Sequence, residues 1–358
     1  MPTFSGEKQL IAHLGASSKW AIAFSGGADS FVLLVELEKI IRTHFANKIE
    51  LLVVHVHHGL LEQADEWAQR CRLLCQQLNL PLVVKYVTVD NVGKGIEAAA
   101  RKARYQAFSD IANEYDIHHF MTAHHLQDQA ETLLFRMLRG TGVAGLQAMS
   151  ETTSYEHYQL HRPFLMVNKK EIVERADKWS KALNWAYIQD PSNHDTHYAR
   201  GVLREHIIPV LNQNWPMWQE NLLRLSDIMK QEQHLLEELA ESDYRYVAGL
   251  CDDTTKCCSD EVGELPDGAG LRGDTSLILS KPLNIASLRQ LSPERQMNLL
   301  RFYLQKNGYK APTQARLLEW IKQINQVHQM GTDRAARLSQ EDVTLVLKDR
   351  KLRFSTSQ

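Results

Sequence analysis

The stretch Trp20-Ala21-Ile22-Ala23-Phe24-Ser25-Gly26-Gly27-Ala28-Asp29-Ser30 decides the fold that we expect for the first half of the chain. It begins with a short apolar run, and from residue 29 to residue 41 apolar residues recur at helical spacing. The pattern predicts a strand, a tight loop at 25–30 and a helix. The start of such a helix offers unpaired N–H groups to a phosphate, and two glycines allow a close approach. The loop is therefore a candidate nucleotide site, although an ordinary turn capped by Ser25 and Asp29 would use the same residue types.

Strand-like and helix-like runs continue to alternate after the loop. Strands are expected at 51–56, 82–89 and 119–122, and helices at 61–78 and 95–115. Such alternation is typical of right-handed crossovers, so we predict an α/β fold with a doubly wound parallel sheet. Polar clusters follow the first, second and fourth strands, and ligands bind where the carboxyl ends of parallel strands meet. These clusters should therefore converge on one crevice.

The remainder of the chain predicts a linker and a second, smaller domain. Helical periodicity is strong over 219–246 and gives way to a Cys-, Asp- and Gly-rich stretch with loop composition. Two further helices and a terminal strand pair are expected after it. We predict a first domain with the candidate nucleotide site at 1–214, a helical linker at 215–250 and a small α+β domain at 251–358.

Charge and cysteine content limit the classes of function. The formal net charge is −2, from 41 basic and 43 acidic residues, so any nucleic-acid-binding surface must be local. The sequence has no apolar run near the ~18 residues that span a bilayer and no export signal, so we expect a cytoplasmic protein without a membrane partner. Five cysteines at irregular spacing argue against a disulfide framework. We expect Cys71 and Cys75 to be small buried thiols on a helix away from the strand ends.

Charged side chains near the strand ends are candidates for chemistry. Asp128 and Glu131 lie three apart, which puts both carboxylates on one face at a helix start, and an ordinary helix-start charge pattern is the alternative. Arg101 and Arg104 could clamp a phosphate, and a solvated helix face paired with Glu97 is the alternative. A basic path that could contact nucleic-acid phosphates, or simply a solvated surface, is formed by Lys169, Lys170, Arg175, Lys178, Lys181, Arg200, Arg204 and Arg224.

The loop and five further motifs together resemble one enzyme family. The segment 25–30 matches the SGGxDS signature of the PP-loop ATP pyrophosphatases. In the family's order the chain then carries VHVHHGL at 54–60, EAAARKARY at 97–105, HHLQDQAET at 124–132, RGTG at 139–142 and DPSN at 190–193. With this set the chain resembles the tRNA(Ile)-lysidine synthetase branch of that superfamily over roughly residues 18–210. The resemblance implies an adenine nucleotide alpha hydrolase-like sheet in an ATP-binding catalytic domain at 1–214, and a tRNA-binding role for the small appended domain at 251–358.

The resemblance implies a two-step reaction on the wobble cytidine of tRNA(Ile) with a CAU anticodon. ATP adenylates the C2 oxygen and releases pyrophosphate, and free L-lysine then displaces AMP to form lysidine, which changes decoding from AUG to AUA. By resemblance the ATP-binding residues are Ser25, Gly26, Gly27, Ala28, Asp29, Ser30, His55 and His57, and Asp29 holds Mg²⁺. The implied catalytic residues are Asp29, Asp128, Glu131, Arg101 and Arg104, and the lysine- and tRNA-binding residues are His125, Asp128, Glu131, Arg139, Arg200 and Arg204.

Two other classes of function stay open at this point. A PP-loop tRNA thiolase also adenylates a base but delivers sulfur, typically with paired cysteine thiolates or an iron–sulfur cluster, and the sequence has no CxxC pair. A non-catalytic tRNA-binding protein with a degenerate nucleotide site is the other class. The sequence also leaves open a homodimer, the tRNA identity elements, the rejection of methionine tRNA, and which of Asp128 and Glu131 acts as base. Longer family members carry a further carboxy-terminal domain, whose equivalent we do not expect within these 358 residues.

Overall fold

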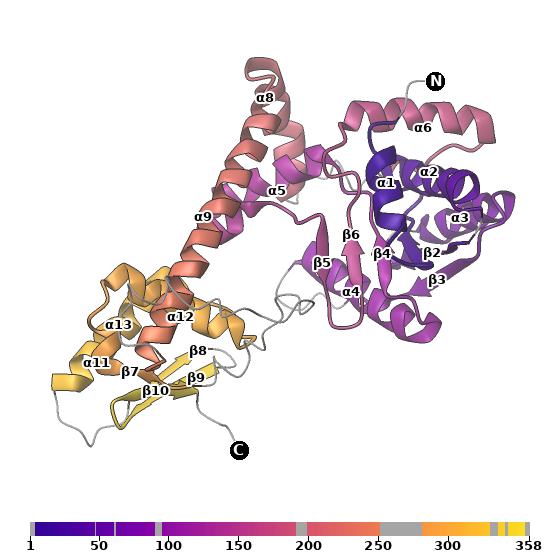
Figure 1. The fold of residues 1–358 in the computed structure, drawn as a ribbon. Coiled ribbons are helices and arrows are strands. Elements are labelled where there is room, and N and C mark those ends of the chain that lie inside the picture. Colours follow the sequence, from indigo (N-terminus) through magenta and orange to yellow (C-terminus); the bar gives the residue numbers. More distant parts are fainter. Residues whose placement is uncertain are drawn as a thin grey trace. The chain divides into compact units, whose positions relative to one another are not determined.

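A mostly parallel sheet forms the centre of the amino-terminal unit, Met1–Met229 (Figure 1). The structure is a computed structural model that describes residues 4–354 except 47, 61, 90–94, 191–198, 251–280, 330–335 and 341–342. Within these residues the sheet has the strand order β3-β2-β1-β4-β6-β5. Its strands are β1 (Lys19–Ala23), β2 (Glu50–His57), β3 (Leu82–Tyr86), β4 (His119–Met121), β5 (Thr152–Ser154) and β6 (Gln159–His161). Neighbouring strands are parallel except for β5 and β6.

The strand order reverses beside β1, and this reversal decides where a ligand can bind. The chain runs outward from β1 through β2 to β3 and then places β4 on the other side of β1, so that Ala21 pairs with both Leu52 and Phe120. In doubly wound sheets the ligand crevice lies outside the carboxyl ends of the strands at such a reversal. The predicted α/β fold with a doubly wound, mostly parallel sheet is confirmed.

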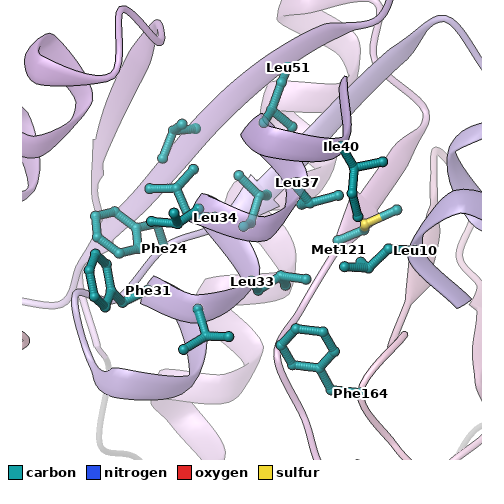
Figure 2. Close-up of a cluster of buried hydrophobic side chains, with 14 of the residues drawn as sticks. Leu10, Phe24, Phe31, Leu33, Leu34, Leu37, Ile40, Leu51, Met121 and Phe164 are labelled. Atoms are coloured by element: carbon teal, nitrogen blue, oxygen red, sulfur yellow. The ribbon is translucent and has the colours of Figure 1, made fainter. Parts of the chain in front are cut away.

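Helices cover both faces of the sheet because successive strand residues point to opposite sides. Trp20 and Ile22 of β1 lie in one core, whereas Ala21 lies in the other, beside Phe108. Figure 2 shows the first core, where side chains of α2 meet Met121 of β4. The helices that contribute to the first core are α1 (Glu7–Leu14), α2 (Ala28–His44), α3 (Ala64–Gln77) and α6 (Lys169–Leu183), and α4 (Ile96–Tyr115) contributes to the second.

A group of shorter helices packs around α5, which follows the carboxyl end of β4. It contains α5 (Leu126–Leu138), the 3-10 helix η1 (Val143–Gln147), α7 (Ala199–Val202), the π-helical turn η3 (Leu203–Ile207), α8 (Ile208–Asn214) and the start of α9 (Trp218–Val247). Ala130 of α5, Ile208 of α8 and Trp218 of α9 form a small buried cluster. This packing holds α7, η3 and α8 near α5, which places arginines from distant sequence beside the α5 carboxylates.

The hairpin of β5 and β6 at the sheet edge was not expected from the sequence. Each strand has only three residues, Thr152–Ser154 and Gln159–His161, so neither shows a recognisable apolar alternation. β6 pairs parallel with β4, and β5 pairs antiparallel with β6. The sheet therefore extends beyond the four strands that the sequence predicts.

The carboxy-terminal unit, Lys230–Gln358, has its own sheet and core. Its antiparallel sheet has the order β7-β10-β9-β8, with strands β7 (Leu283–Asn284), β8 (Ala336–Gln340), β9 (Val343–Lys348) and β10 (Lys351–Phe354). The end of α9 packs with α11 (Ile285–Leu288), α12 (Pro293–Lys306) and α13 (Gln314–Gln329) around a buried core that includes Tyr303 and Trp320. The predicted small α+β domain is confirmed.

The long helix α9 runs through the division between the two units. It covers most of the predicted linker at 215–250, while the Cys-, Asp- and Gly-rich stretch that follows lies outside the described residues. The three-part division of the chain stays a prediction. None of the helices in the described part of the chain is both long and apolar enough to cross a membrane.

Candidate active site

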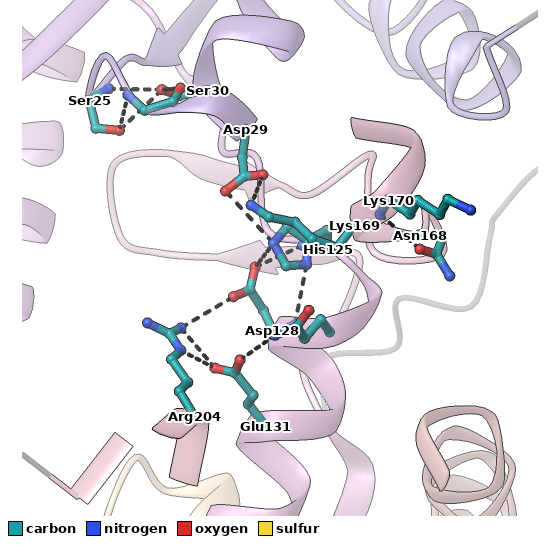
Figure 3. Close-up of polar contacts among 12 residues, drawn as sticks. Ser25, Asp29, Ser30, His125, Asp128, Glu131, Asn168, Lys169, Lys170 and Arg204 are labelled. Atoms are coloured by element: carbon teal, nitrogen blue, oxygen red, sulfur yellow. Dashed lines mark hydrogen bonds and ion pairs between the residues drawn. The ribbon is translucent and has the colours of Figure 1, made fainter. Parts of the chain in front are cut away.

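The loop at 25–30 connects β1 to α2 and is held in shape by two serine hydroxyls (Figure 3). Gly27 is extended and forms the N-cap of α2. Ser30 Oγ donates to the Gly27 carbonyl at 3.1 Å and accepts from the Ser25 N–H at 3.2 Å. Ser25 Oγ accepts in turn from the Gly27 N–H at 3.3 Å. The loop therefore closes at the amino end of a helix, where the helix dipole favours an anion such as phosphate.

Ile188 and Cys71 lie against the loop at Gly26. Gly26 has a φ of +85°, and a Cβ there would meet Ile188 Cδ1 at 2.4 Å and Cys71 Sγ at 3.1 Å. The Ile188 N–H also donates to the Gly26 carbonyl at 2.8 Å. The expectation that Cys71 lies away from the strand ends is wrong, because α3 shares the α2 core and directs this thiol beneath the loop. Both Cys71 and Cys75 are buried as predicted, and burial raises the pKa of each thiol to about 12.

The histidines at the end of β2 lie next to the start of the loop. His55 Nδ1–H donates to the carbonyl of Phe24 at 2.9 Å, and burial lowers the pKa of His55, which keeps the ring neutral. His57 Nε2 lies 3.2 Å from a carboxylate oxygen of Asp65, and its ring packs against Tyr86. His55 therefore supports the residue from which the loop departs. The part of either histidine in binding adenosine stays a prediction.

Asp29 begins a series of charged contacts that joins three helix starts (Figure 3). Its Oδ1 accepts a hydrogen bond from the ammonium of Lys169, and its Oδ2 lies 3.7 Å from Nε2 of His125. Lys169 is the first residue of α6, whose N-cap Asn168 accepts from the Lys170 N–H at 2.8 Å. The carboxylate that the sequence places in the loop is thus paired with a cation from 140 residues further along the chain.

His125 and Asp128 cap the amino end of α5. The His125 N–H donates to Asp128 Oδ2 at 2.9 Å, and the Asp128 N–H donates to His125 Nδ1 at 3.4 Å. Burial alone would raise the pKa of the Asp128 carboxyl, but the imidazoles of His125 and His124, the His125 N–H and the Arg204 guanidinium hold this pKa below its usual value. Asp128 is therefore a carboxylate at neutral pH, fixed at the positive end of a helix.

Glu131 lies one turn further along α5 and pairs with Arg204 of η3. Arg204 donates to Glu131 Oε2 at 2.9 Å through Nε and at 2.7 Å through Nη2. Glu131 Oε1 accepts from Gln127 Nε2 at 3.0 Å, so both of its oxygens are occupied, and the residue is 4% exposed. The side chain of Asp128 is more accessible, at 24%, and its Oδ1 lies 3.9 Å from Arg204. Arg204 thus contacts both carboxylates that the sequence singled out.

A cavity of about 440 Å³ opens beside these carboxylates. Its lining residues are Arg101, His124, Asp128, Glu131, Thr132, Phe135, Arg136, Arg139, Thr141, Met149 and Arg200. Asp128 and Glu131 supply negative charge, and four guanidinium groups supply positive charge. The structure brings together the predicted Arg101, Asp128, Glu131, Arg139 and Arg200, although they come from α4, from α5 with its C-cap, and from α7.

Arg104 is half-buried close to two histidines that follow β2 and β4. Burial lowers the pKa of His58 to about 4, and the charge of Arg104 adds to this shift. Burial also lowers the pKa of His124 to about 4; the Asp128 carboxylate opposes the shift, and the arginines, Arg101 and Arg104 among them, add to it. Both rings are therefore neutral near pH 7. Arg104 does not line the cavity, so its predicted catalytic part would act at the strand ends rather than on the cavity wall.

Several cavity residues were missed in the sequence, although α5 carried a signal for them. Asp128, Thr132, Phe135 and Arg139 follow one another at spacings of four, three and four residues, which lie on one helix face. Arg136 also lines the cavity, and its Nη1 donates to the carbonyls of residues 145 and 148 at 3.0 Å each. Asp128 and Glu131 mark the start of this face, so it could have been recognised from the sequence by following the helical spacing onward from them.

Two residues of the predicted basic path on α6 have acidic partners within the protein. The guanidinium of Arg175 donates to Glu36, whose side chain is fully buried, and lies over the ring of Phe4. Lys169 is paired with Asp29 instead of facing open solvent. These two cations therefore stabilise the first unit and its loop. Contact of the other basic residues with RNA stays a prediction.

The fit of the loop to a metal ion can be judged from Asp29. Among the described residues no three His, Cys, Asp or Glu side chains gather as metal ligands. Mg²⁺ in nucleotide sites, however, is commonly bound by one or two carboxylates and completed by substrate phosphates and water. Asp29 already holds a cation, the Lys169 ammonium, next to the amino end of α2. A single carboxylate in this position suits a metal that arrives with ATP.

Comparison with known proteins agrees with this arrangement. Residues 5–211 match the family model described as a PP-loop domain, and residues 283–351 match the model described as a TilS substrate binding domain. The tRNA(Ile)-lysidine synthase of Bordetella parapertussis is 36% identical over 90% of this chain and 85% of its own length. That of Actinobacillus pleuropneumoniae is 34% identical over 88% of this chain, which spans only 66% of the relative.

A solved structure supports the fold alone. The U34-tRNA thiolase NcsA from Methanococcus maripaludis is 14% identical, with a TM-score of 0.52 over 63% of this chain and 78% of its own. The shared fold does not distinguish lysine transfer from sulfur transfer. The two cysteines that the structure describes are buried thiols, and the other three lie outside the described residues.

Proposed function

The chain belongs to the tRNA(Ile)-lysidine synthase family of ATP-dependent PP-loop ligases, and we propose that it attaches L-lysine to the wobble cytidine of tRNA(Ile) with a CAU anticodon. In the first step the C2 oxygen of the cytidine attacks the α-phosphate of ATP, and pyrophosphate leaves. In the second step the lysine amine attacks C2, and the oxygen leaves with AMP. The product, lysidine, would then decode AUA instead of AUG. We also propose a cytoplasmic location, where ATP, lysine and tRNA occur together.

The observation that carries the proposal is the cavity of about 440 Å³ with charges of both signs, joined to the nucleotide loop through His125. Nε2 of His125 lies 3.7 Å from Asp29 in the loop and 3.5 Å from Asp128 in the cavity wall. A base held in the cavity would therefore lie near the phosphates of a nucleotide held by the loop. Adenylation of that base needs this proximity.

For adenylation, the loop residues bind and orient ATP. The Gly27 N–H and the Ser30 hydroxyl at the start of α2 would donate to the phosphates, and Asp29 would hold Mg²⁺. Bound Mg²⁺ supplies positive charge that neutralises the pyrophosphate leaving group. The Lys169 ammonium donates to Asp29. Once Asp29 holds the metal, this ammonium would donate to a phosphate oxygen instead. Each of these groups favours the charge that develops as pyrophosphate leaves.

For lysine transfer, the cavity offers a place for each charged group of the amino acid. Lysine carries ammonium groups and a carboxylate, which require opposite partners. Asp128 is the more exposed of the two carboxylates, so we assign to it the contact with the reacting amine, with Glu131 holding Arg204 in place beside it. Arg136, Arg139 or Arg200 would bind the lysine carboxylate or an RNA phosphate. The amine must lose a proton as the new bond forms, and a nearby carboxylate favours that loss.

The experiment that tests this function follows radiolabelled lysine. Purified protein is mixed with ATP, Mg²⁺, labelled lysine and unmodified tRNA(Ile) bearing CAU, and the label that stays on RNA after mild alkali is counted, since alkali removes aminoacyl esters. ATP-dependent, alkali-stable label is expected. A tRNA with the cytidine replaced by uridine is the control. Release of AMP on adding tRNA, without any stable label, would contradict lysine transfer and favour the tRNA thiolase.

A further inference from the structure

A second groove, of about 420 Å³, lies beside the reaction cavity and is not used by the steps above. Its walls come from one face of α4 and from Tyr155, in the turn between β5 and β6. Figure 1 shows α4 beside this hairpin. Arg101 lines both the groove and the reaction cavity, so the two spaces are neighbours separated by one side chain.

Aromatic rings form the floor of this groove. The ring of Tyr105 lies 5.2 Å from that of Tyr155, which in turn stacks on Tyr158 with centroids 4.8 Å apart and planes 14° from parallel. Tyr158 is buried, whereas Tyr105 and Tyr155 are half-buried and line the open space. The buried Tyr158 thus packs against Tyr155, which contacts Tyr105, so the two half-buried rings are held in fixed positions.

Positive charge lies along the edge of the same groove. The guanidinium of Arg101 lies over the ring of Tyr105, 4.8 Å from its centroid, and the exposed Lys102 follows it on α4. An aromatic floor with a cationic edge is the combination that single-stranded nucleic acids use, because bases stack on the rings and phosphates pair with the cations. A purely apolar partner would leave both cations without a counter-charge.

We propose that this groove binds the base of a nucleotide next to the reacting cytidine, stacked on Tyr155 beside Tyr105, with its phosphate near Arg101 and Lys102. The proposal rests on the proposed function, since it takes the RNA in the reaction cavity as its starting point. Arg101 then separates two neighbouring bases of one strand. The groove positions the anticodon loop and contributes to binding the tRNA, without taking part in the bond-forming steps.

The test places 2-aminopurine, a fluorescent base, on either side of the cytidine in the CAU tRNA and follows its fluorescence as full-length protein is added. Quenching is expected at one of the two positions, because stacking on an aromatic ring quenches this base. Tyr155→Leu should remove the quenching and raise the Kd for tRNA roughly 5- to 100-fold. Tyr155→Phe, which keeps the ring, should behave as the wild type. Tyr115→Leu, at the far end of α4, is the matched control and should change neither signal.

A second pair of variants tests the groove without relying on Tyr155→Leu, which could also affect folding. Lys102→Glu alters only an exposed side chain and should weaken tRNA binding. It should also lower the slope of log Kd against log salt concentration by about one, the value for one phosphate contact. Lys48→Glu, between α2 and β2 at the opposite end of the sheet, is its control. Unchanged quenching and Kd in Tyr155→Leu, or equal losses in Tyr155→Phe and Tyr155→Leu, would overturn the stacking assignment.

Lysine incorporation on the same RNA separates this inference from the function on which it rests. If the wild type attaches lysine and Tyr155→Leu shows an unchanged KM for tRNA, the groove proposal fails and the function stands. If tRNA binding and quenching occur without lysine attachment, the groove stands and the function fails. A raised KM for tRNA with an unchanged kcat in Tyr155→Leu supports both.

Discussion

Substitution of Gly26 by alanine tests how strictly the nucleotide loop is shaped. Gly26 has a φ of +85°, and a Cβ there would lie 2.4 Å from Ile188 Cδ1. The left-handed backbone costs a non-glycine residue about 1–2 kcal/mol, and overpacking adds about 1–3 kcal/mol, of which rotation of the Ile188 side chain relieves a part. We therefore expect Gly26→Ala to lower the free energy of unfolding by about 2–4 kcal/mol.

The same change should weaken ATP binding, because relief of the clash moves the loop. Loss of one hydrogen bond to a charged phosphate corresponds to roughly 10- to 100-fold in Kd. Denaturant unfolding measures the stability, and titration with a fluorescent ATP analogue measures the Kd. Gly15→Ala is the control, since Gly15 has a φ of −63° and its nearest neighbours are ordinary contacts, so it should be neutral within about 0.5 kcal/mol or slightly stabilising.

A double mutant isolates the steric part of the effect. Ile188→Val removes Cδ1 and alone costs about 0.5–1.5 kcal/mol. If the clash is the cause, Gly26→Ala with Ile188→Val should cost at least about 1 kcal/mol less than the sum of the two single changes. Additive costs would refute the contact as the cause, and a Gly26→Ala protein with wild-type stability and ATP affinity would refute the reasoning altogether.

Four further results are expected. Asp29→Ala should abolish tRNA-dependent pyrophosphate release, because the metal loses its carboxylate; release near the wild-type rate would refute that role. Glu131→Ala should spare adenylation and block lysine transfer, and equal loss of both steps would instead put Glu131 in the metal site. Lys169→Met should raise KM for ATP roughly 10- to 100-fold through loss of a charged hydrogen bond, with KM for lysine unchanged as the internal control. Burial holds the pKa of His124 near 4, against 6.5 in the unfolded chain, so the neutral ring's contribution to the free energy of unfolding is complete above pH 6.5 and is lost as pH falls toward 4. The loss should be about 2 kcal/mol at pH 5. A His124→Gln protein with the same pH dependence of unfolding would contradict this.

The elements of the first unit follow closely from the sequence. Apolar runs and helical spacing predict the four central strands and the helices after them, since burial on both faces of a parallel sheet demands such runs. The helix face that carries Asp128 and Glu131 is also recognisable, because a helix places every third or fourth residue on one side. The edge hairpin is not, since three-residue strands show too little alternation.

The sequence alone determined the loop, the order of the first four strands and the helices between them, and the residue types that could bind a nucleotide. Only the tertiary structure decided their partners. Asp29 pairs with Lys169, Glu131 pairs with Arg204, and Cys71 lies under Gly26 rather than away from the strand ends. The physical reason is that backbone periodicity is local, whereas these contacts arise where helices from distant segments pack at the same edge of the sheet.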